Sequence, residues 1–141
     1  ARSYVRTGED DPRAISDEVL VEAVKAHRVV AASGPFIEAW IGEAGIGDAV
    51  AVAGPVDLDV RLQAPSWMPV DWLRVYVNGD LLIEEPVTGT EALRYEGAFA
   101  LDVAAGDWVV VMAGAPDRDL APVSPGQRVL SVANPIRIIA P

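Results

Sequence analysis

The chain has no cysteine, which excludes disulfide bonds and thiolate metal sites and is compatible with any compartment. Its single histidine is His27, so a Ser-His-Asp triad or a histidine-ligated metal would have to use that residue. No apolar run approaches the roughly 20 residues of a membrane-spanning helix, and no segment has the pattern of a signal peptide. Basic residues number 11 against 21 acidic ones, and the net charge of −10 argues against a nucleic-acid surface. We therefore expect no metal, no cofactor, no nucleic acid and no membrane span.

Short apolar runs dominate what is present. Hydrophobic residues make up 51% of the 141 residues, and 12 Gly and 11 Pro divide them into pieces. Short apolar runs bounded by turn residues are typical of a β-sandwich or barrel. A chain of this length buries about two-thirds of the surface of its unfolded state, so it can form one domain without a disulfide or a metal.

Residues 70–83 have the clearest pattern in the chain. Two rows of side chains alternate there, one of Leu73, Val75 and Val77, the other of Trp72, Arg74 and Tyr76. Because successive side chains of a strand point to opposite faces, this alternation predicts a strand with one aliphatic face, which we expect in the core. Asn78-Gly79 tolerates the positive φ angles of a two-residue turn, so the stretch predicts a β-hairpin.

One helix is predicted at residues 16–27. Ser16 is a good N-cap, acidic residues follow it, and an apolar stripe with helical spacing begins at Leu20. The stripe predicts that one face of the helix is packed against a neighbour. Residues 1–15, which precede the helix, are expected to be mostly loop.

Further strands follow from the apolar spacing. We expect them at residues 29–32, 36–41, 49–53, 56–62, 93–103, 108–112, 127–132 and 136–139. The strand 108–112 is apolar throughout, which is typical of a central strand. Residues 116–126 are rich in proline and predict a long loop. The fold class is therefore mainly β: an immunoglobulin-like antiparallel β-sandwich with one N-terminal α-helix.

Two motifs with a chemical interpretation have a simpler structural one. His27 lies at the end of the predicted helix, where a positive charge is favoured by the helix dipole, so we expect no catalytic role. The glycine-rich residues 42–47 superficially resemble a phosphate loop. Such a loop must open a helix, and here a strand is expected to follow, so the segment predicts a turn.

The acidic residues do not predict a catalytic or calcium site. Asp117 and Asp119 lie in the predicted long loop, and residues 9–11 are also acidic, but neither segment has the spacing of a calcium loop. Glu84 and Glu85 are neighbours in a strand, so they point to opposite faces and cannot act as a carboxylate pair. We expect solvated side chains in each case.

The candidate interaction surface consists of Trp67, Trp72, Arg74 and Tyr76. Aromatic side chains of this kind form sugar-stacking platforms or protein contacts, but a sandwich also commonly buries a Trp on its third strand. On the first interpretation we expect an open aromatic shelf. On the second, the row from Trp72 to Tyr76 is covered, either by the N-terminal helix and lead-in or by a further domain.

Several stretches of the chain resemble one protein family. These are Tyr4-Val5 with the helix that follows, residues 28–36, Gly45-Ile46-Gly47-Asp48, residues 75–79, residues 107–111, and Ala133-Asn134-Pro135-Ile136. Together they resemble the segment after the catalytic barrel in PHP-type metal-dependent phosphoesterase-like proteins, in the carbamate-hydrolase-like branch. In that family a barrel rich in His, Asp and Glu binds the metals and performs hydrolysis.

The resemblance implies a division of the chain and a role. Residues 1–35 would be the lead-in, helix and connecting strand at the tail of the catalytic domain, and residues 36–141 the sandwich domain. None of the family's ligand motifs occurs in this sequence, so no catalytic residue is carried over. The expected function is that of a non-catalytic accessory domain whose partner is the catalytic domain of the same polypeptide. The alternative is a carbohydrate- or protein-binding immunoglobulin-like module that uses exposed aromatics.

Overall fold

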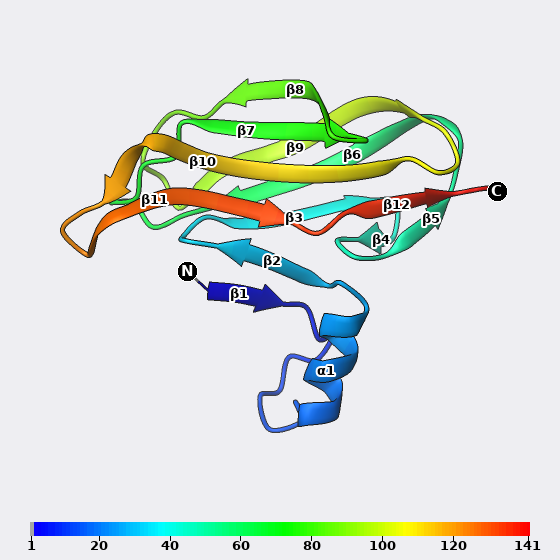
Figure 1. Cartoon of the computed structure of the whole chain (residues 1–141), viewed down its shortest axis with the longest axis horizontal. Helices are drawn as coiled ribbons and strands as arrows, with labels where there is room; N and C mark the ends of the chain where they lie inside the picture. The colour runs from blue at the N-terminus through cyan, green and yellow to red at the C-terminus, as the bar shows by residue number, and fades with distance from the viewer. Residues whose placement is uncertain (1) are drawn as a thin grey trace.

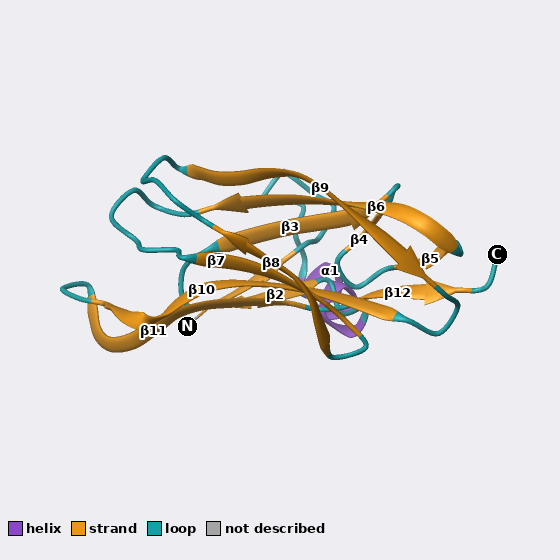
Figure 2. Ribbon diagram, turned by 90° about the horizontal axis from the view of Figure 1, so that it is seen from above, coloured by secondary structure: helices purple, strands orange, loops and turns teal. Residues whose placement is uncertain are grey.

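The structure, a computed structural model, describes residues 2–141 and is mainly β. Two sheets face each other in two layers, and the single helix of the described residues lies outside them (Figures 1 and 2). The larger sheet contains β1 (Arg2–Val5), β2 (Val29–Ala32), β5 (Ala49–Ala51), β7 (Trp72–Val77), β8 (Asp80–Pro86), β10 (Trp108–Leu120), β11 (Ser124–Ala133) and β12 (Ile136–Ile139). The smaller sheet contains β3 (Phe36–Ile41), β4 (Ala44–Gly45), β6 (Gly54–Gln63) and β9 (Leu93–Val103).

Strand β10 is the centre of the larger sheet, as its apolar sequence predicted. It pairs with β7 on one side, and on the other with β12 near its start and β11 further along. The sheet continues from β7 to β8 and from β11 through β2 to β1. All of these pairings are antiparallel, whereas β12 pairs with β5 in parallel. The expectation of a purely antiparallel sheet is therefore wrong at this edge.

The predicted hairpin is confirmed. Asn78 and Gly79 have φ angles of 55° and 92° and join β7 to β8, with Val77 paired to Asp80. The Asn78 side chain also fixes the start of β10, because its amide nitrogen donates to Asp107 (2.7 Å) and its oxygen accepts from the Trp108 amide (3.1 Å). The turn therefore sets the register of β10 as well as that of its own strands.

The core lies between the two sheets, and the predicted aliphatic row belongs to it. Leu73 and Val75 are fully buried, and Val77 packs against the same cluster. The larger sheet also contributes Val109, Val111, Val129, Ile136 and Ile138, and the smaller sheet contributes Ile37, Leu58, Val60, Leu62 and Leu101. Strands β3, β6 and β9 of the smaller sheet alternate buried and more exposed residues over most of their length, as half-buried strands should.

The prediction of a long loop at residues 116–126 is wrong. Strand β10 continues to Leu120 and β11 begins at Ser124. The ladder tolerates the prolines because its register shifts between Ala115 and Asp119. Asp119 then closes the turn, since its carboxylate accepts from the amides of Ala121 (3.0 Å) and Gly126 (2.9 Å).

The N-terminal segment forms β1, helix α1 (Asp17–Lys25) and β2. The expectation of a loop-like lead-in is wrong at β1, which pairs with β2. The Ser16 side chain caps the helix by accepting from the amide of Val19 (3.4 Å), as predicted. Because β2 pairs with β11, the hydrogen bonds of the larger sheet cross the expected boundary between residues 35 and 36.

Helix α1 projects away from the two sheets (Figure 1). Of its apolar stripe Ala23 is buried and Val19 half-buried, whereas Leu20 is 40% and Val24 52% exposed. The prediction of a packed helix face therefore holds only for the side of the helix with Val19 and Ala23 and is wrong for Leu20 and Val24 within the described residues. No helix in the described part of the chain is long and apolar enough to cross a membrane.

Candidate interaction surfaces

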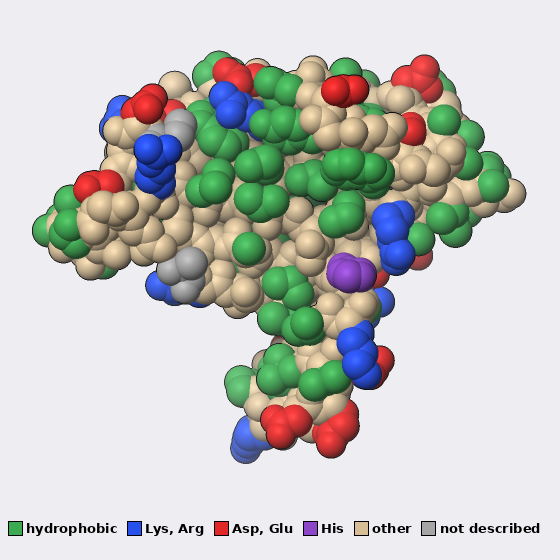
Figure 3. Space-filling model, viewed as in Figure 1, with side chains coloured by type: hydrophobic (Ala, Val, Ile, Leu, Met, Phe, Trp, Pro, Cys, Tyr) green, Lys and Arg blue, Asp and Glu red, His purple; other side chains and the backbone are tan. Residues whose placement is uncertain are grey.

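The outward face of the larger sheet is apolar over several adjacent strands. Cross-strand pairing places Trp72 beside Gly114, Arg74 beside Met112 and Tyr76 beside Val110. The row continues into β11 and β8 by the same pairing. We call these residues the outer apolar face: Trp72, Tyr76, Leu81, Trp108, Val110, Met112, Leu130 and Val132. Figure 3 shows hydrophobic side chains gathered over the middle of this sheet.

Within this face Trp72 is not an open shelf. It is 8% exposed, and the guanidinium of Arg74 lies 4.2 Å from the centroid of its ring. A Cβ atom at Gly114 would lie 3.2 Å from the same ring, so the indole lies across a strand position that has no side chain. Trp72 is therefore covered by its own neighbours, which corrects the expectation that it offers a stacking surface to a ligand.

Arg74 and Tyr76 complete the row without cover from the helix. Arg74 donates to Glu84 (2.6 Å), and this hydrogen bond raises the pKa of Arg74 above its ordinary value. Tyr76 is partly exposed. Strands β10, β11 and β2 lie between β7 and the strand next to the helix, so α1 and the lead-in do not cover this row as one expectation had it.

Trp67 lies in a different place. It is 53% exposed and lines a groove of about 1060 Å³ formed at one end of the molecule by residues 66–71, residues 87–90 and the turn between β10 and β11. We call this the loop-end groove. Trp72, Arg74 and Tyr76 are not among its lining residues, so the four candidate residues belong to two separate surfaces rather than one.

Arg94, which the sequence interpretation missed, organises the groove. This side chain is 8% exposed and donates to the carbonyl oxygens of Pro65 (2.7 Å), Met68 (3.1 Å) and Gly89. It therefore joins the segment that carries Trp67 to the segment that carries Gly89. The alternation of β9 did not predict its burial, because Arg94 falls in the row opposite the core residues Phe99 and Leu101 and is buried where the ladder with β6 shifts its register.

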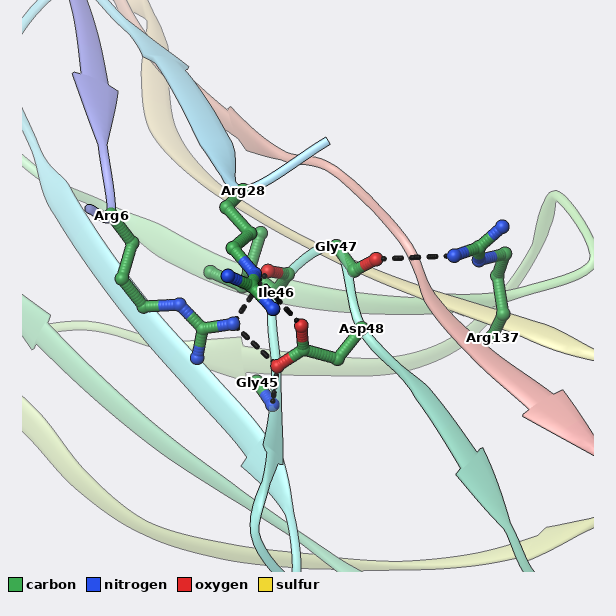
Figure 4. A network of polar contacts seen from close by, with 7 residues as sticks. All are labelled: Arg6, Arg28, Gly45, Ile46, Gly47, Asp48 and Arg137. Carbon is green, nitrogen blue, oxygen red and sulfur yellow. Dashed lines mark hydrogen bonds and ion pairs between the residues drawn. The ribbon is translucent and has the colours of Figure 1, made fainter. Parts of the chain in front are cut away.

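A polar network fixes the N-terminal segment to the sheets (Figure 4). The carboxylate of Asp48 accepts from the guanidinium groups of Arg6 and Arg28 (3.0 Å for Arg28) and from the amide of Gly45 (3.0 Å). Partial burial acts to raise the pKa of Asp48, but the hydrogen bonds from Arg6, Gly45 and Arg28 outweigh it and lower the pKa below its ordinary value. The network joins β1 and the start of β2 to the loop before β5.

His27 has a structural role at the end of the helix. Its amide donates to Val24 (3.0 Å) and the next amide, of Arg28, donates to Ala23 (3.0 Å), which is the hydrogen-bond pattern of a Schellman cap. His27 itself has a φ of 60°, a conformation usually taken by glycine, and its side chain is exposed. The sequence indicated the helix end but not this backbone strain.

The other candidates have the geometry of turns and solvated side chains. Residues 42–47 lead into strand β5 and not into a helix, so the turn prediction is confirmed. Asp117 and Asp119 are exposed, and Glu84 pairs with Arg74. Within residues 2–141, no three His, Cys, Asp or Glu side chains are grouped where they could hold a metal ion.

Comparison with known proteins adds little to this geometry. No family model and no curated protein matches the chain. The CARDB domain of a Pyrococcus furiosus protein, a solution NMR structure, aligns with a TM-score of 0.47 and 15% identity, covering 75% of this chain and 96% of that domain. An engineered protein known from a crystal structure aligns with a TM-score of 0.39 and 20% identity, covering 77% of this chain and 21% of its own. Neither similarity assigns a family or a function.

Proposed function

We propose that this chain is a non-catalytic accessory β-sandwich, immunoglobulin-like in arrangement, from a PHP-type phosphoesterase-like protein, a metal-dependent hydrolase. Its work is to pack against the catalytic domain of the same polypeptide and to support it. The observation that carries the proposal is the outer apolar face, together with the exposed apolar side of helix α1.

The central strand supports the proposal most directly. In an antiparallel sheet with one solvated face, strands alternate between apolar and polar residues, whereas strands covered on both faces are apolar throughout. In β10, Val109 and Val111 point into the core, and Val110 and Met112 point outward. Adjacent strands extend this apolar outward surface, and large contiguous patches of this kind mark interaction sites on soluble proteins.

Helix α1 supports it independently. An isolated helix of nine residues is marginal in water, yet this one has a side-chain cap at its start and a Schellman cap at its end. Its exposed residues Leu20, Val21 and Val24 have nothing to pack against in the described chain. Figure 3 shows hydrophobic side chains on the helix in the same view as the outer apolar face, so a single neighbour can cover both.

The chemistry of the chain agrees with an accessory role. The family that the sequence resembles performs hydrolysis with metal ligands in its barrel, and that resemblance places the barrel before this segment. The chain itself holds one histidine, placed at a helix end, and no cysteine. We therefore assign the chain no catalytic residue, no metal and no cofactor.

The test compares this chain with the longer polypeptide that its gene encodes. The sequence upstream of Ala1 should contain His-x-His, Glu and Asp-x-His motifs. Hydrogen exchange should then be slower in the longer protein at α1 and at β8, β7 and β10. Strands β6 and β9 of the smaller sheet serve as the internal control and should not change. Equal exchange in both proteins, or an upstream region without metal-ligand motifs, would contradict the proposal.

A second function is favoured by one specific observation. Trp67 is a large aromatic side chain that is exposed in a groove with an otherwise largely polar lining, and exposed aromatic side chains with a polar handle are common in binding surfaces. A binding module would use this groove and not Trp72. Since the groove and the outer apolar face are separate, the two functions are compatible.

A further inference from the structure

We propose that the loop-end groove is a saccharide-binding site, with Trp67 as the residue on which a neutral sugar ring stacks. This inference specifies the ligand class of the second function given above and is independent of the docking of a catalytic domain. It rests on how rigidly Trp67 is held and on the polar groups that surround it.

The segment that carries Trp67 is fixed on both sides. The amide of Met68 donates to the carbonyl oxygen of Pro65 (3.0 Å), which closes a turn with Trp67 near its tip. Arg94 holds the same two residues from below through their carbonyl oxygens, and Met68 is buried. A ligand that stacks on Trp67 therefore meets a side chain whose backbone is already ordered, and this preorganisation lowers the entropic cost of binding.

The groove presents both donors and acceptors, which is what sugar hydroxyl groups require. Thr88 and Thr90 carry hydroxyl groups that donate and accept. Asp117 supplies a carboxylate acceptor and Arg128 a guanidinium donor, and neither side chain has an ion-pair partner within residues 2–141. A hydroxyl group can donate to the first and accept from the second.

The charges of the groove favour a neutral ligand. Asp71 and Arg118 form an ion pair across it, with 3.4 Å between their charged atoms. The carboxylate of Asp119 is already engaged by two backbone amides of the turn, which lower its pKa. With Asp117 and Arg128 included, the lining has three acidic and two basic side chains, an excess of one negative charge that does not favour an anionic ligand.

A protein partner fits the groove less well. Protein interfaces are anchored by apolar and aromatic side chains that enter apolar pockets. Apart from Trp67, the larger apolar residues of this lining are Met68, Val70 and Val87, and all three are buried by the domain itself. They form a floor and leave no apolar pocket for a partner's side chain.

The experiment is affinity electrophoresis of the purified chain in native gels that contain a soluble neutral polysaccharide. The probes are a β-1,3-glucan, a β-1,4-xylan, a galactomannan and an α-1,4-glucan, with heparin as the anionic comparison. We expect retardation by at least one neutral polysaccharide and none by heparin. Trp67→Ala should weaken the measured affinity at least about tenfold, the loss typical of truncating an aromatic anchor, and Trp67→Tyr should restore most of it.

The control variant is Trp108→Ala, which removes another exposed tryptophan that does not line the groove. It should bind like the unaltered chain. No retardation by any of the four neutral polysaccharides would overturn the proposal, as would binding that survives Trp67→Ala or is lost equally in Trp108→Ala. Preferential retardation by heparin would indicate an anion site and would also overturn it. None of these results bears on the exchange experiment, which tests the docking face separately.

Discussion

Two leucines provide the sharpest test of how helix α1 relates to the rest of the molecule. Leu20 lies on the helix and is 40% exposed, whereas Leu73 lies in β7 and is fully buried. Replacing each with alanine removes the same atoms. Any difference in the loss of stability therefore reports the packing of the site and not the chemistry of the substitution.

The structure gives the size of the difference. Replacing a fully buried leucine with alanine lowers the free energy of unfolding by about 2–5 kcal/mol, because buried apolar area is lost and a cavity is left behind. We expect Leu73→Ala to fall in that range. Leu20 borders no closed core, and alanine has a slightly higher helix propensity than leucine. Leu20→Ala should therefore lower the free energy of unfolding by less than about 1 kcal/mol, close to the range of surface substitutions.

The assay is urea denaturation of both variants, followed by tryptophan fluorescence and far-ultraviolet circular dichroism. The midpoint should fall markedly for Leu73→Ala and hardly at all for Leu20→Ala, with similar m values. If helix α1 docks on a catalytic domain as proposed, the cost of Leu20→Ala in that longer protein should rise to about 2 kcal/mol or more, as in a packed site. If Leu20→Ala costs as much as Leu73→Ala in the short chain, helix α1 is docked there and the reasoning is refuted.

Three further substitutions test other parts of the structure. Asp48→Asn should lower the free energy of unfolding by about 1–2 kcal/mol at neutral pH, because it weakens hydrogen bonds to charged, partly exposed partners. The folded-state pKa of Asp48 is lowered from 3.8, so its carboxylate stabilises the folded state above pH 3.8, and this stabilisation is lost as the pH falls through the folded-state pKa. The stability of Asp48→Asn should therefore depend less on pH below 3.8 than that of the unaltered chain. His27→Gly should raise the melting temperature by a few degrees, because glycine adopts a φ of 60° without the strain, about 0.5–1 kcal/mol, that a residue with a side chain has there. An unchanged or lower melting temperature would contradict the capping assignment. Trp72→Ala should cost about 2 kcal/mol or more in chemical denaturation, and a neutral result would show that the ring is not covered.

The parts of the fold that depend on local chemistry were predictable. Strand β9 has the bounds expected from its alternation, and the hairpin turn at Asn78-Gly79 follows from the φ angles that these residues tolerate. Ser16 begins the helix for a similarly local reason. In each case the residues that decide the structure are close together in the sequence.

The pairings between distant segments were not predictable. Strand β2 enters the larger sheet by pairing Ala32 with Ser131, and no local pattern indicates which strand it would join. Trp72 is buried because Gly114, far along the chain, leaves room for its ring. The helix stripe at Leu20 has the spacing of a packed face, but spacing alone does not say whether the packing partner lies within the same domain.

The candidate site was predicted in part for the same reason. Trp67, Trp72, Arg74 and Tyr76 are aromatic or basic residues near one another in the sequence, which suggested one surface. The connection from β6 in the smaller sheet to β7 in the larger sheet carries Trp67, whereas the other three residues lie in β7 on a sheet face. Arg94 was missed because its partners are backbone carbonyl oxygens, which no sequence motif records.

The distribution of charge bears on which partner can cover the outer apolar face. Beside the outer apolar face, Arg74 and Glu84 form an ion pair that is neutral as a unit, and Arg137 lies opposite Trp108 in the ladder. The acidic excess behind the net charge of −10 therefore lies on the rest of the surface. When two copies approach through this face, those charges repel each other at the rim, whereas a neighbour with basic groups at its edge is attracted. The acidic surface around the face therefore favours a partner of complementary charge over a second copy of this chain.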